Sequence, residues 1–521
     1  MALGRARRNL RAQTVLIASQ LEIRNQKKND TRRSNTPAAM PRMDVREQAG
    51  VALRSLGRKT EQSGTLNQTL FRPPAPTPRD EPLTLFALLS VLRNNPLEAW
   101  TRAHFTQPFV RSGLPFLPVI VVSQPTAIQR VLLDNAANYR KDDFLLRVLS
   151  GALDNGLLTV DGDQWRRQRR AVAPLFARKT IFGFAPQVLD AADALVARWN
   201  ELADGRVIDV ADEITHTTLD VLSRTIFSQG IEREIDDFQS AMRIYFDTIG
   251  RIDPMDALGL PEFLPRPTRF RARGAIRFFD EAVDAIIERR RRLLAEAPGE
   301  SPRDLLTLLL EARDASGAPL DEKEVRANIF TFIAAGHETT ANAVTWSLFL
   351  LSQDPEWAAR VAAEADCSPQ GDDPRAHLVE TRAVIEEALR LYPPIAAISR
   401  AAIEDDELAG EPVRAGTMVI VAPYVVHRHE LLWTAPSAFD PHRFLGRARE
   451  DVNRFAYLPF GTGPRICVGA AFALQEAMLL LMSITRNFTL SAIPGAAVEP
   501  LLRITLRPKG GLPMRLSRRS R

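Results

Sequence analysis

Apolar residues recur at helical spacing over most of the chain from residue 126 to about residue 390, and this pattern predicts a mainly helical protein. The longest predicted helix runs from about Glu322 to Ser352. Asp321 and Glu324 have the spacing of a capping box at its start, and Pro355 lies just beyond its end. At ~1.5 Å per residue this helix would be ~45 Å long, enough to cross the whole molecule.

Short β-type segments are expected near the start and end of this helical region. Residues 114–122 and 417–422 are rich in β-branched side chains, and residues 501–516 alternate like a hairpin. Neither a repeat nor an internal linker is visible, so the sequence predicts one α+β domain, mainly α with a small β part. A proline-rich leader at 71–78 marks its start, and the catalytic domain is expected to span 71–521.

Composition and charge narrow the class of protein. The chain of 521 residues is 45% hydrophobic and 25% charged, which is ordinary for a globular protein. It has two cysteines, too few for a disulfide framework, and Cys367 is interpreted as a structural or exposed residue. No nucleic-acid motif occurs, and no apolar run of ~20 residues indicates a transmembrane segment. A cytoplasmic protein is therefore expected.

The first 70 residues differ from the remainder. They contain 14 Lys and Arg against 5 Asp and Glu, and no aromatic residue. A disordered basic extension is expected, or a start placed too early, with Met40 or Met43 as later candidates. Organelle targeting or peripheral membrane contact by this segment stays open.

A glycine-rich loop contains the other cysteine, Cys467, directly before an apolar helix predicted over 470–482. The start of a helix favours a thiolate over a thiol, because the helix dipole and free N–H groups stabilise negative charge. Gly461 and Gly469 allow the backbone to approach a flat partner closely. A thiolate in such a loop is suited to ligate a haem iron.

The loop resembles the haem-ligand signature of the cytochrome P-450 family, which reads Phe, two residues, Gly, one, Arg, one, Cys, one, Gly. Every fixed position is matched between Phe460 and Gly469. The resemblance implies haem b with Cys467 as the metal ligand, and Phe460, Gly461 and Gly469 as cofactor contacts. It also implies the P-450 fold, in which the long central helix crosses the haem and the cysteine loop lies on the opposite face.

The middle of the long helix carries an unusual segment, Ala335 to Thr340 (AGHETT). Glycine, an acid and two threonines are poor choices for a buried helix centre, although a threonine hydroxyl can bond the backbone four residues back and bend the helix. The segment resembles the family's oxygen-activation motif. By that match Thr339 and Glu338 are catalytic, as hydrogen-bond donor and proton relay, and Gly336 lies at the cofactor. His337 is expected to be exposed.

Two further motifs occur in the family's order. Glu387 and Arg390, three residues apart on a helix, with Arg443 downstream, resemble a buried cluster that supports the cysteine loop. His442 stands where relatives often carry an acid. Without the resemblance, a pair at this spacing would be a surface ion pair worth a few tenths of a kcal/mol.

The other motif is a tryptophan and an arginine four residues apart on one helical face. The resemblance implies that Trp165, Arg169, Arg400 and Arg465 contact the haem propionates, which accept charge-assisted hydrogen bonds. Gln168 stands where relatives often carry histidine. On its own, the segment would be a solvated basic helix.

The resemblance implies a monooxygenase that inserts one atom of O2 into a small lipophilic substrate. No Gly-x-Gly-x-x-Gly motif indicates a fused reductase, so ferredoxin with its reductase, flavodoxin or a diflavin reductase is expected to supply electrons. The alternatives are a peroxide-dependent peroxygenase or isomerase-type relative, and a non-catalytic haem-thiolate sensor. One set of arginines is interpreted either as a basic docking face for an acidic partner or as solvated surface: Arg166, Arg170, Arg447, Arg449 and Arg454.

The substrate pocket is expected to be small and apolar. Residues 244–270 are apolar and punctuated by prolines, and they resemble the family's mobile lid between two helices. Such a lining fits fatty acids, terpenoids, steroids and aromatic xenobiotics equally. The other expected lining residues are Ala334, Ala335, Ile395, Ala396, Ala397 and Ile398.

Overall fold

The computed structural model describes residues 70–519 apart from 115–116, 143–145, 147–154, 229–239, 243, 245–247, 249–266 and 369–375. The basic extension up to residue 69 and most of the predicted lid lie outside the described residues. The described part forms one compact unit within Leu70–Arg521.

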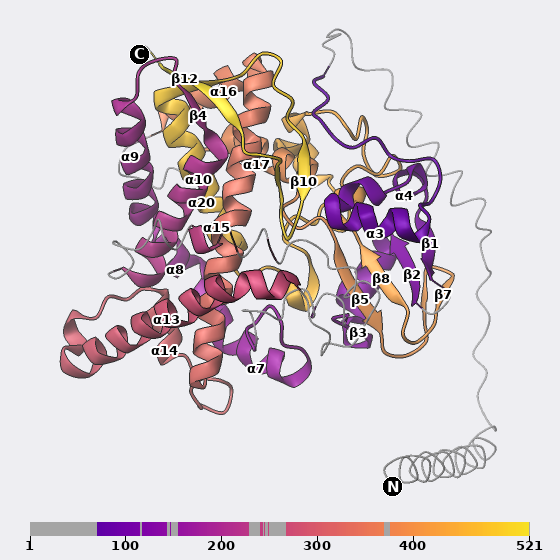
Figure 1. The fold of residues 1–521 in the computed structure, drawn as a ribbon, viewed down its shortest axis with the longest axis horizontal. Coiled ribbons are helices and arrows are strands. Elements are labelled where there is room, and N and C mark those ends of the chain that lie inside the picture. Colours follow the sequence, from indigo (N-terminus) through magenta and orange to yellow (C-terminus); the bar gives the residue numbers. More distant parts are fainter. Residues whose placement is uncertain are drawn as a thin grey trace. The chain divides into compact units, whose positions relative to one another are not determined.

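A 32-residue helix, α15 (Glu322–Gln353), forms the centre of the helical region. Both halves of its capping box, Asp321 and Glu324, are present, as predicted. Its buried side chains lie on all sides, which is typical of a helix that crosses a core. Figure 1 shows α15 running through the middle of the helices. It packs against α10 (Val210–Leu222), α13 (Pro267–Glu296), α17 (Val379–Leu391) and α20 (Ala470–Asn487).

The remaining helices surround this centre. The longer ones are α3 (Leu85–Asn94), α7 (Gly162–Val172), α9 (Ala185–Glu201), α14 (Leu305–Glu311) and α16 (Pro355–Cys367). The short ones are η1 (Pro96–Ala99), α4 (Arg102–Thr106), α5 (Pro125–Gln129), η2 (Arg130–Asp134), η3 (Ala136–Asn138), η4 (Ala173–Phe176), α8 (Arg178–Phe182), η5 (Ser223–Phe227), η6 (Pro298–Glu300), α18 (Pro423–Val426), η8 (Pro441–Phe444), α19 (Gly446–Glu450) and η9 (Gly463–Arg465).

The strands form a five-stranded sheet and three small sheets, and the large sheet lies to one side of the helices in Figure 1. Its order is β1-β2-β8-β5-β3, with β2 and β8 parallel and the other pairs antiparallel. The smaller sheets are β10-β11, β4-β12-β9 and β6-β7. The bounds are β1 (Phe109–Leu114), β2 (Leu117–Val122), β3 (Tyr139–Arg140), β4 (Val207–Asp209), β5 (Ile398–Ala402), β6 (Asp406–Leu408), β7 (Glu411–Val413), β8 (Met418–Val421), β9 (Phe488–Ala492), β10 (Pro500–Leu502), β11 (Leu506–Pro508) and β12 (Pro513–Arg518).

The predicted α+β architecture, mainly α with a small β part, is confirmed. The C-terminal segment differs in detail from the predicted hairpin over 501–516. Only β10 and β11 pair as a hairpin, whereas β12 inserts between β4 and β9. Through β12 the C-terminal end pairs with β4, a strand about 300 positions earlier in the chain. The alternation of apolar and polar residues within one segment cannot reveal such a partner.

Candidate functional site

The loop before α20 is fixed by a backbone hydrogen bond at Cys467 and by a close backbone approach at Gly463. The Cys467 N–H donates to the carbonyl of Phe460 at 2.9 Å, which closes the loop. Gly463 has a φ of 73°, and a Cβ on it would lie 1.8 Å from the carbonyl oxygen of Leu132. A side chain cannot be accommodated there because the obstacle is backbone. Gly461 also has a positive φ, and Gly469 is the N-cap residue of α20.

Protein atoms surround Cys467 densely, yet its side chain keeps accessible surface, so it is not packed as a small hydrophobe. Burial raises the pKa of its thiol, while the Gly469 N–H and the charge of Arg169 act in the opposite direction. Without a bound metal, desolvation outweighs these two local groups, which act in the direction that the sequence predicts. Iron bound to the sulfur would itself displace the proton.

Cationic side chains from separate elements converge near this loop. The Arg465 guanidinium lies 4.2 Å from the ring centre of Trp165 on α7 and pairs with Asp161. The positive charge of Arg465 repels those of Arg400 on β5 and Lys141. Burial and then Arg465 lower the pKa of Arg400 to about 10 and that of Lys141 to about 7. Such mutual repulsion in a half-buried cluster is relieved by an anion, and two carboxylates would suit it.

These residues fit an iron porphyrin. One sulfur, a close-approach loop and a cluster of cations match an axial ligand, a flat ring and its propionates. Within the described part of the chain, no group of three or more His, Cys, Asp or Glu side chains could hold a metal ion. Lys141 was missed by the sequence reasoning, because it belongs to no motif and its position depends on distant segments.

A buried ion pair lies behind the loop. Glu387 and Arg390, both 0% exposed, make two hydrogen bonds of 2.6 and 2.7 Å, and Arg390 also donates to the carbonyls of His427, Pro436 and Ala438. The Arg443 Nε lies 3.7 Å from Glu387. The structure thus brings the three predicted cluster residues together. Because Glu387 and Arg390 are fully buried and hydrogen-bonded, the cluster is a rigid joint and not a surface pair.

His427 links this joint to the cysteine loop. Its Nε2 accepts from the N–H of Leu458 at 2.7 Å, two residues before Phe460, and its Nδ1 lies 3.2 Å from the carbonyl oxygen of Arg390. Burial, followed by the charge of Arg390, lowers the pKa of His427 to about 3, so the ring is neutral. The sequence reasoning missed His427, since a lone histidine near a short strand carries no signal.

The α15 motif is held mostly by its own helix. The Thr339 hydroxyl donates to the carbonyl of Ala335 at 2.7 Å. His337 is 2% exposed, and its Nδ1 contacts the carbonyl of Ile333 at 2.9 Å. The prediction that His337 is exposed is therefore wrong, because the ring lies within the core, next to α10, whose Thr218 hydroxyl donates to the His337 carbonyl at 3.1 Å. Burial lowers the pKa of His337 to about 4.

Two other motif residues meet neighbouring elements. A Cβ on Gly336 would lie 3.2 Å from methyl carbons of Leu222, so this glycine allows α10 to approach α15 closely. Glu338 is buried, and its Oε1 lies 3.5 Å from a guanidinium nitrogen of Arg507 on β11. Arg507 is another residue that the sequence reasoning missed.

The expected pocket residues divide by exposure. Ala334 and Ala396 are buried, whereas Ala335, Ala397 and Ile395 are exposed, Ile395 to 42%. The Cδ1 of Ile398 lies 3.8 Å from the position of a Cβ on Gly461, so this segment lies against the cysteine loop. Apolar side chains thus keep free surface beside the loop.

The candidate docking arginines are not equivalent. Arg166, Arg170, Arg447 and Arg454 are exposed. Arg449 instead makes three hydrogen bonds of 3.0 to 3.2 Å to the carboxylate of Glu386, so its side chain supports the fold. Gln168 is fully buried and bonds Glu324 and Asn328 at the start of α15.

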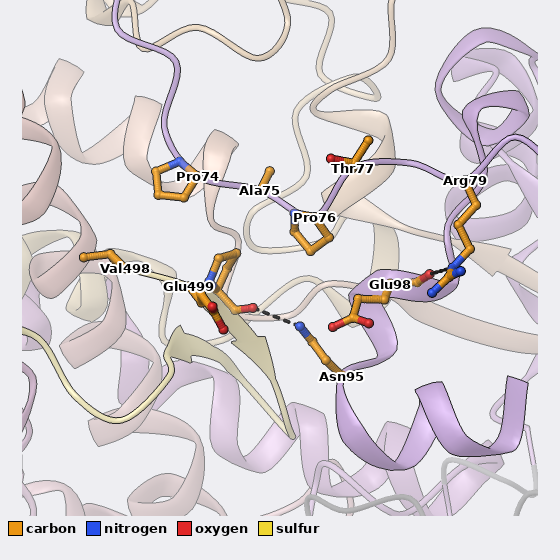
Figure 2. A pocket seen from close by; sticks show the side chains of 10 residues that line it. Pro74, Ala75, Pro76, Thr77, Arg79, Asn95, Glu98, Val498 and Glu499 are labelled. Carbon is orange, nitrogen blue, oxygen red and sulfur yellow. Dashed lines mark hydrogen bonds between the residues drawn. The ribbon is translucent and has the colours of Figure 1, made fainter. Parts of the chain in front are cut away.

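A separate groove of about 380 Å³ is lined by none of these motif residues (Figure 2). The proline-rich leader forms one wall, and Asn95 with the residues at the start of β10 forms the other. Figure 2 shows Asn95 donating to the carbonyl of Pro500, at 3.1 Å. The groove is lined by Pro74, Ala75, Pro76, Thr77, Arg79, Asn95, Glu98, Val498, Glu499 and Pro500.

One described stretch, Arg178–Glu201, is long and apolar enough to cross a membrane by length and composition alone. It contains α8 and α9. Five α9 side chains are buried, among them Leu195 and Trp199, and the helix packs against α10 and α20. Core helices pass the same test of length and composition.

Comparison with known proteins agrees with these motifs. The family model described as "Cytochrome P450" matches residues 74–513. Cyclooctat-9-en-7-ol 5-monooxygenase of Streptomyces melanosporofaciens is 37% identical over 66% of this chain and 75% of its own length. Pentalenene oxygenase of Streptomyces avermitilis is 34% identical over 70% of this chain and 80% of its own.

More distant matches extend the likeness. The human ultra-long-chain fatty acid omega-hydroxylase is 30% identical over 76% of this chain and 79% of its own length. The crystal structure of the cytochrome P450DA haem domain is similar with a TM-score of 0.75 at 27% identity. The match covers 86% of this chain and 98% of that structure.

Proposed function

Since the chain belongs to the cytochrome P-450 family, we propose a role for each residue that would serve its chemistry. The protein is a haem-thiolate monooxygenase that binds haem b and needs O2 and a redox partner. When bound, the haem supplies the oxygen-activating chemistry. The chain itself contributes the residues that bind the cofactor, position the substrate and move protons.

Cys467 is proposed as the iron ligand. The observation that carries this is its position: a deep sulfur with free surface, in a loop whose backbone is fixed by Gly463 and by the bond to Phe460. Cys467→Ser should abolish the red-shifted carbon-monoxide band of the reduced protein, because a hydroxyl cannot replace thiolate donation. Cys367→Ser is the matched control. A Cys467 variant with an unchanged band would overturn the assignment.

The propionates are assigned to the cationic cluster. Trp165, Arg169, Arg400 and Arg465 would bind the two carboxylates, and Lys141 would contribute a further charge. Phe460, Gly461, Gly469 and Gly336 would lie against the ring. Glu387, Arg390 and Arg443 are proposed to hold the loop in place from behind.

On the oxygen side, Thr339 and Glu338 are proposed to move protons. Thr339 Oγ donates to Ala335 in this structure, and a turn about its side chain would redirect that proton into the site. Glu338 would take protons from solvent and pass them inward. This requires a carboxylate within reach of both the solvent and the Thr339 hydroxyl. The retained acid and alcohol favour O2-dependent turnover over the peroxide-dependent alternative or a sensor.

For the substrate, we propose a neutral cyclic terpenoid. The exposed Ile395 and Ala397, with Ile398 against the loop, offer apolar surface that suits a hydrocarbon skeleton. The two Streptomyces relatives are named for compounds of this kind. A long-chain fatty acid is a second candidate, supported by the name of the human relative.

A spectral titration separates the two candidates. Neutral polycyclic terpenes should displace water from the haem iron and shift the absorbance at low concentration, whereas fatty acids of equal carbon number should require far more. Turnover with a ferredoxin and its reductase would then show a hydroxylated product. If only the fatty acids shift the spectrum, the terpenoid assignment is wrong, while the monooxygenase activity is untouched.

The electron donor is proposed to be a separate acidic protein, a ferredoxin, flavodoxin or diflavin reductase. The exposed Arg166, Arg170, Arg447 and Arg454 would attract it, and such rim charges act mainly on the association rate. Reduction should therefore slow with added salt. We also propose that residues 71–521 form the catalytic domain and that the protein acts in the cytoplasm.

A further inference from the structure

One stripe of α15 contacts the C-terminal hairpin β10–β11. Glu338, Asn342 and Trp346 are spaced by four residues, so their side chains lie on the same face of the helix. The Asn342 amide donates to the hydroxyl of Thr505 at 3.2 Å, and the Trp346 indole donates to the carbonyl of Leu506, also at 3.2 Å. The hairpin therefore follows the helix over two turns.

The third contact of this stripe is an ion pair at the centre of the motif. The Arg507 guanidinium lies 3.5 Å from the Glu338 carboxylate, and the two side chains are 24% and 9% exposed. Glu338 immediately precedes Thr339. Because the pair is largely shielded, it is screened less by salt than a surface pair and orients the carboxylate more firmly.

The hairpin that carries Arg507 is itself fixed from outside. Asn95 binds β10 through both of its amide atoms, donating to the Pro500 carbonyl and accepting from the Leu502 N–H, each at 3.1 Å. Figure 2 shows the first of these bonds at the groove. On the inner side, the Leu506 N–H donates to the carbonyl of Pro394 at 3.0 Å. Arg507 thus extends from a hairpin that is tied to three other segments, at Asn95, at Pro394 and on α15.

We propose that Arg507 is the positioning residue for Glu338 in proton delivery. An arginine does not give up its proton in a protein, so it cannot be a relay itself. Its charge favours the ionised carboxylate and holds it at the boundary between solvent and the Thr339 side chain. Glu338 can then accept a proton from water and release the same proton inward. This inference rests on the proposed role of Glu338.

The test uses the full-length holoprotein with a substrate that gives a spectral shift. Arg507→Leu should lower the product formed per electron supplied by roughly three- to tenfold, with the lost electrons appearing as peroxide, because a misplaced relay slows protonation. Haem content and substrate affinity should stay unchanged. Arg507→Lys should recover most of the yield, since it restores the charge. Lys509→Met is the control, because Lys509 forms an exposed pair with Glu499 on the same hairpin.

A double variant shows whether Arg507 acts through Glu338. Adding Arg507→Leu to Glu338→Gln should cause no further loss of yield and no further change in the solvent deuterium isotope effect on peroxide release. Additive losses would overturn the inference. If Glu338→Gln alone has no effect, the proposed relay itself is wrong. If Glu338→Gln lowers the yield and Arg507→Leu does not, the relay stands and only the role of Arg507 falls. If Arg507→Leu loses haem, Arg507→Lys is measured in its place. A solvent deuterium isotope effect equal to that of the parent protein would support the inference, and a changed isotope effect in a variant that keeps its haem would overturn it.

Discussion

The cysteine loop and the middle of α15 are proposed to serve opposite sides of one site, yet they are held in different ways. The loop is fixed by contacts with distant segments: Leu132 against Gly463, and the Glu387–Arg390 pair through His427. The α15 motif is held mainly by bonds to its own helix backbone. The metal-ligand side is therefore rigid, whereas on the oxygen side the Thr339 side chain can turn without disturbing the fold.

Removing the buried carboxylate behind the loop should have the largest effect. Glu387→Ala leaves the fully buried Arg390 guanidinium without its main partner, and breaking such a pair lowers the free energy of unfolding by ~3–5 kcal/mol. Haem content should fall in parallel, because Arg390 also anchors His427. Chemical denaturation and the carbon-monoxide spectrum would measure the two effects.

A second buried pair is the control for this variant. Arg290 and Asp304, 4% and 1% exposed, join α13 to α14, and their hydrogen bonds go to Thr307 and Phe227 and not to the cysteine loop. Asp304→Ala should cause a similar loss of stability but leave the thiolate spectrum of the folded fraction intact. Equal spectral changes in both variants would show that Glu387 supports the fold only in general.

Replacing one glycine in the cysteine loop and one in the middle of α15 by alanine tests the difference in rigidity between the two regions. Gly463→Ala places a Cβ against the Leu132 carbonyl in a positive-φ conformation, so we expect a loss of at least ~2–3 kcal/mol and weak haem retention. Gly336→Ala meets only movable methyl groups of Leu222 and gains helix propensity, so its stability should change by less than ~1 kcal/mol. Thermal unfolding of the two variants compares them directly, and an equal loss in both would remove the distinction.

The elements of both regions could be predicted from local sequence. The capping box of α15, the cysteine loop and the Glu387–Arg390 spacing are all short-range patterns. Their partners could not, because Lys141, His427 and Arg507 approach from segments that are distant along the chain. The wrong predictions have the same origin. The burial of His337 and the pairing of β12 with β4 and β9 depend on segments that are distant along the chain, and a linear sequence does not contain that information.

His427 allows the rigidity of the loop to be tested by pH. Its folded pKa of about 3 lies below the ordinary value of 6.5, so the unfolded chain binds a proton first as pH falls. The stability that neutral His427 contributes is thus complete above pH 6.5 and is lost progressively toward pH 3. His427→Gln keeps an acceptor for Leu458 but does not titrate. It should cost ~1 kcal/mol at neutral pH and flatten the decline in stability below pH 6.5.

Haem retention is measured against pH for the parent protein and for His427→Gln. His337 should contribute to the same decline, since its pKa is also lowered, to about 4. The variant therefore should keep a residual slope and not lose it altogether. Identical slopes of haem retention against pH in the variant and the parent protein would contradict this role. They would mean that His427 has the same protonation in the folded and unfolded chains, or that the loop opens before the whole fold unfolds.

Thr339→Ala should have the smallest effect on the fold and still change the reaction. Its hydroxyl is half-exposed and bonds the Ala335 carbonyl of its own helix, so stability should change by within ~0.5 kcal/mol. Haem content and substrate affinity should be retained. Without the hydroxyl, protons are misdirected, so electrons should leave as peroxide in place of product. Thr345→Ala, a buried threonine six residues further along α15, is the control for a change of helix packing. If Thr339→Ala keeps the parent yield of product per electron, the oxygen side of the site must lie elsewhere, and the contrast between a rigid and an adjustable side loses its functional meaning.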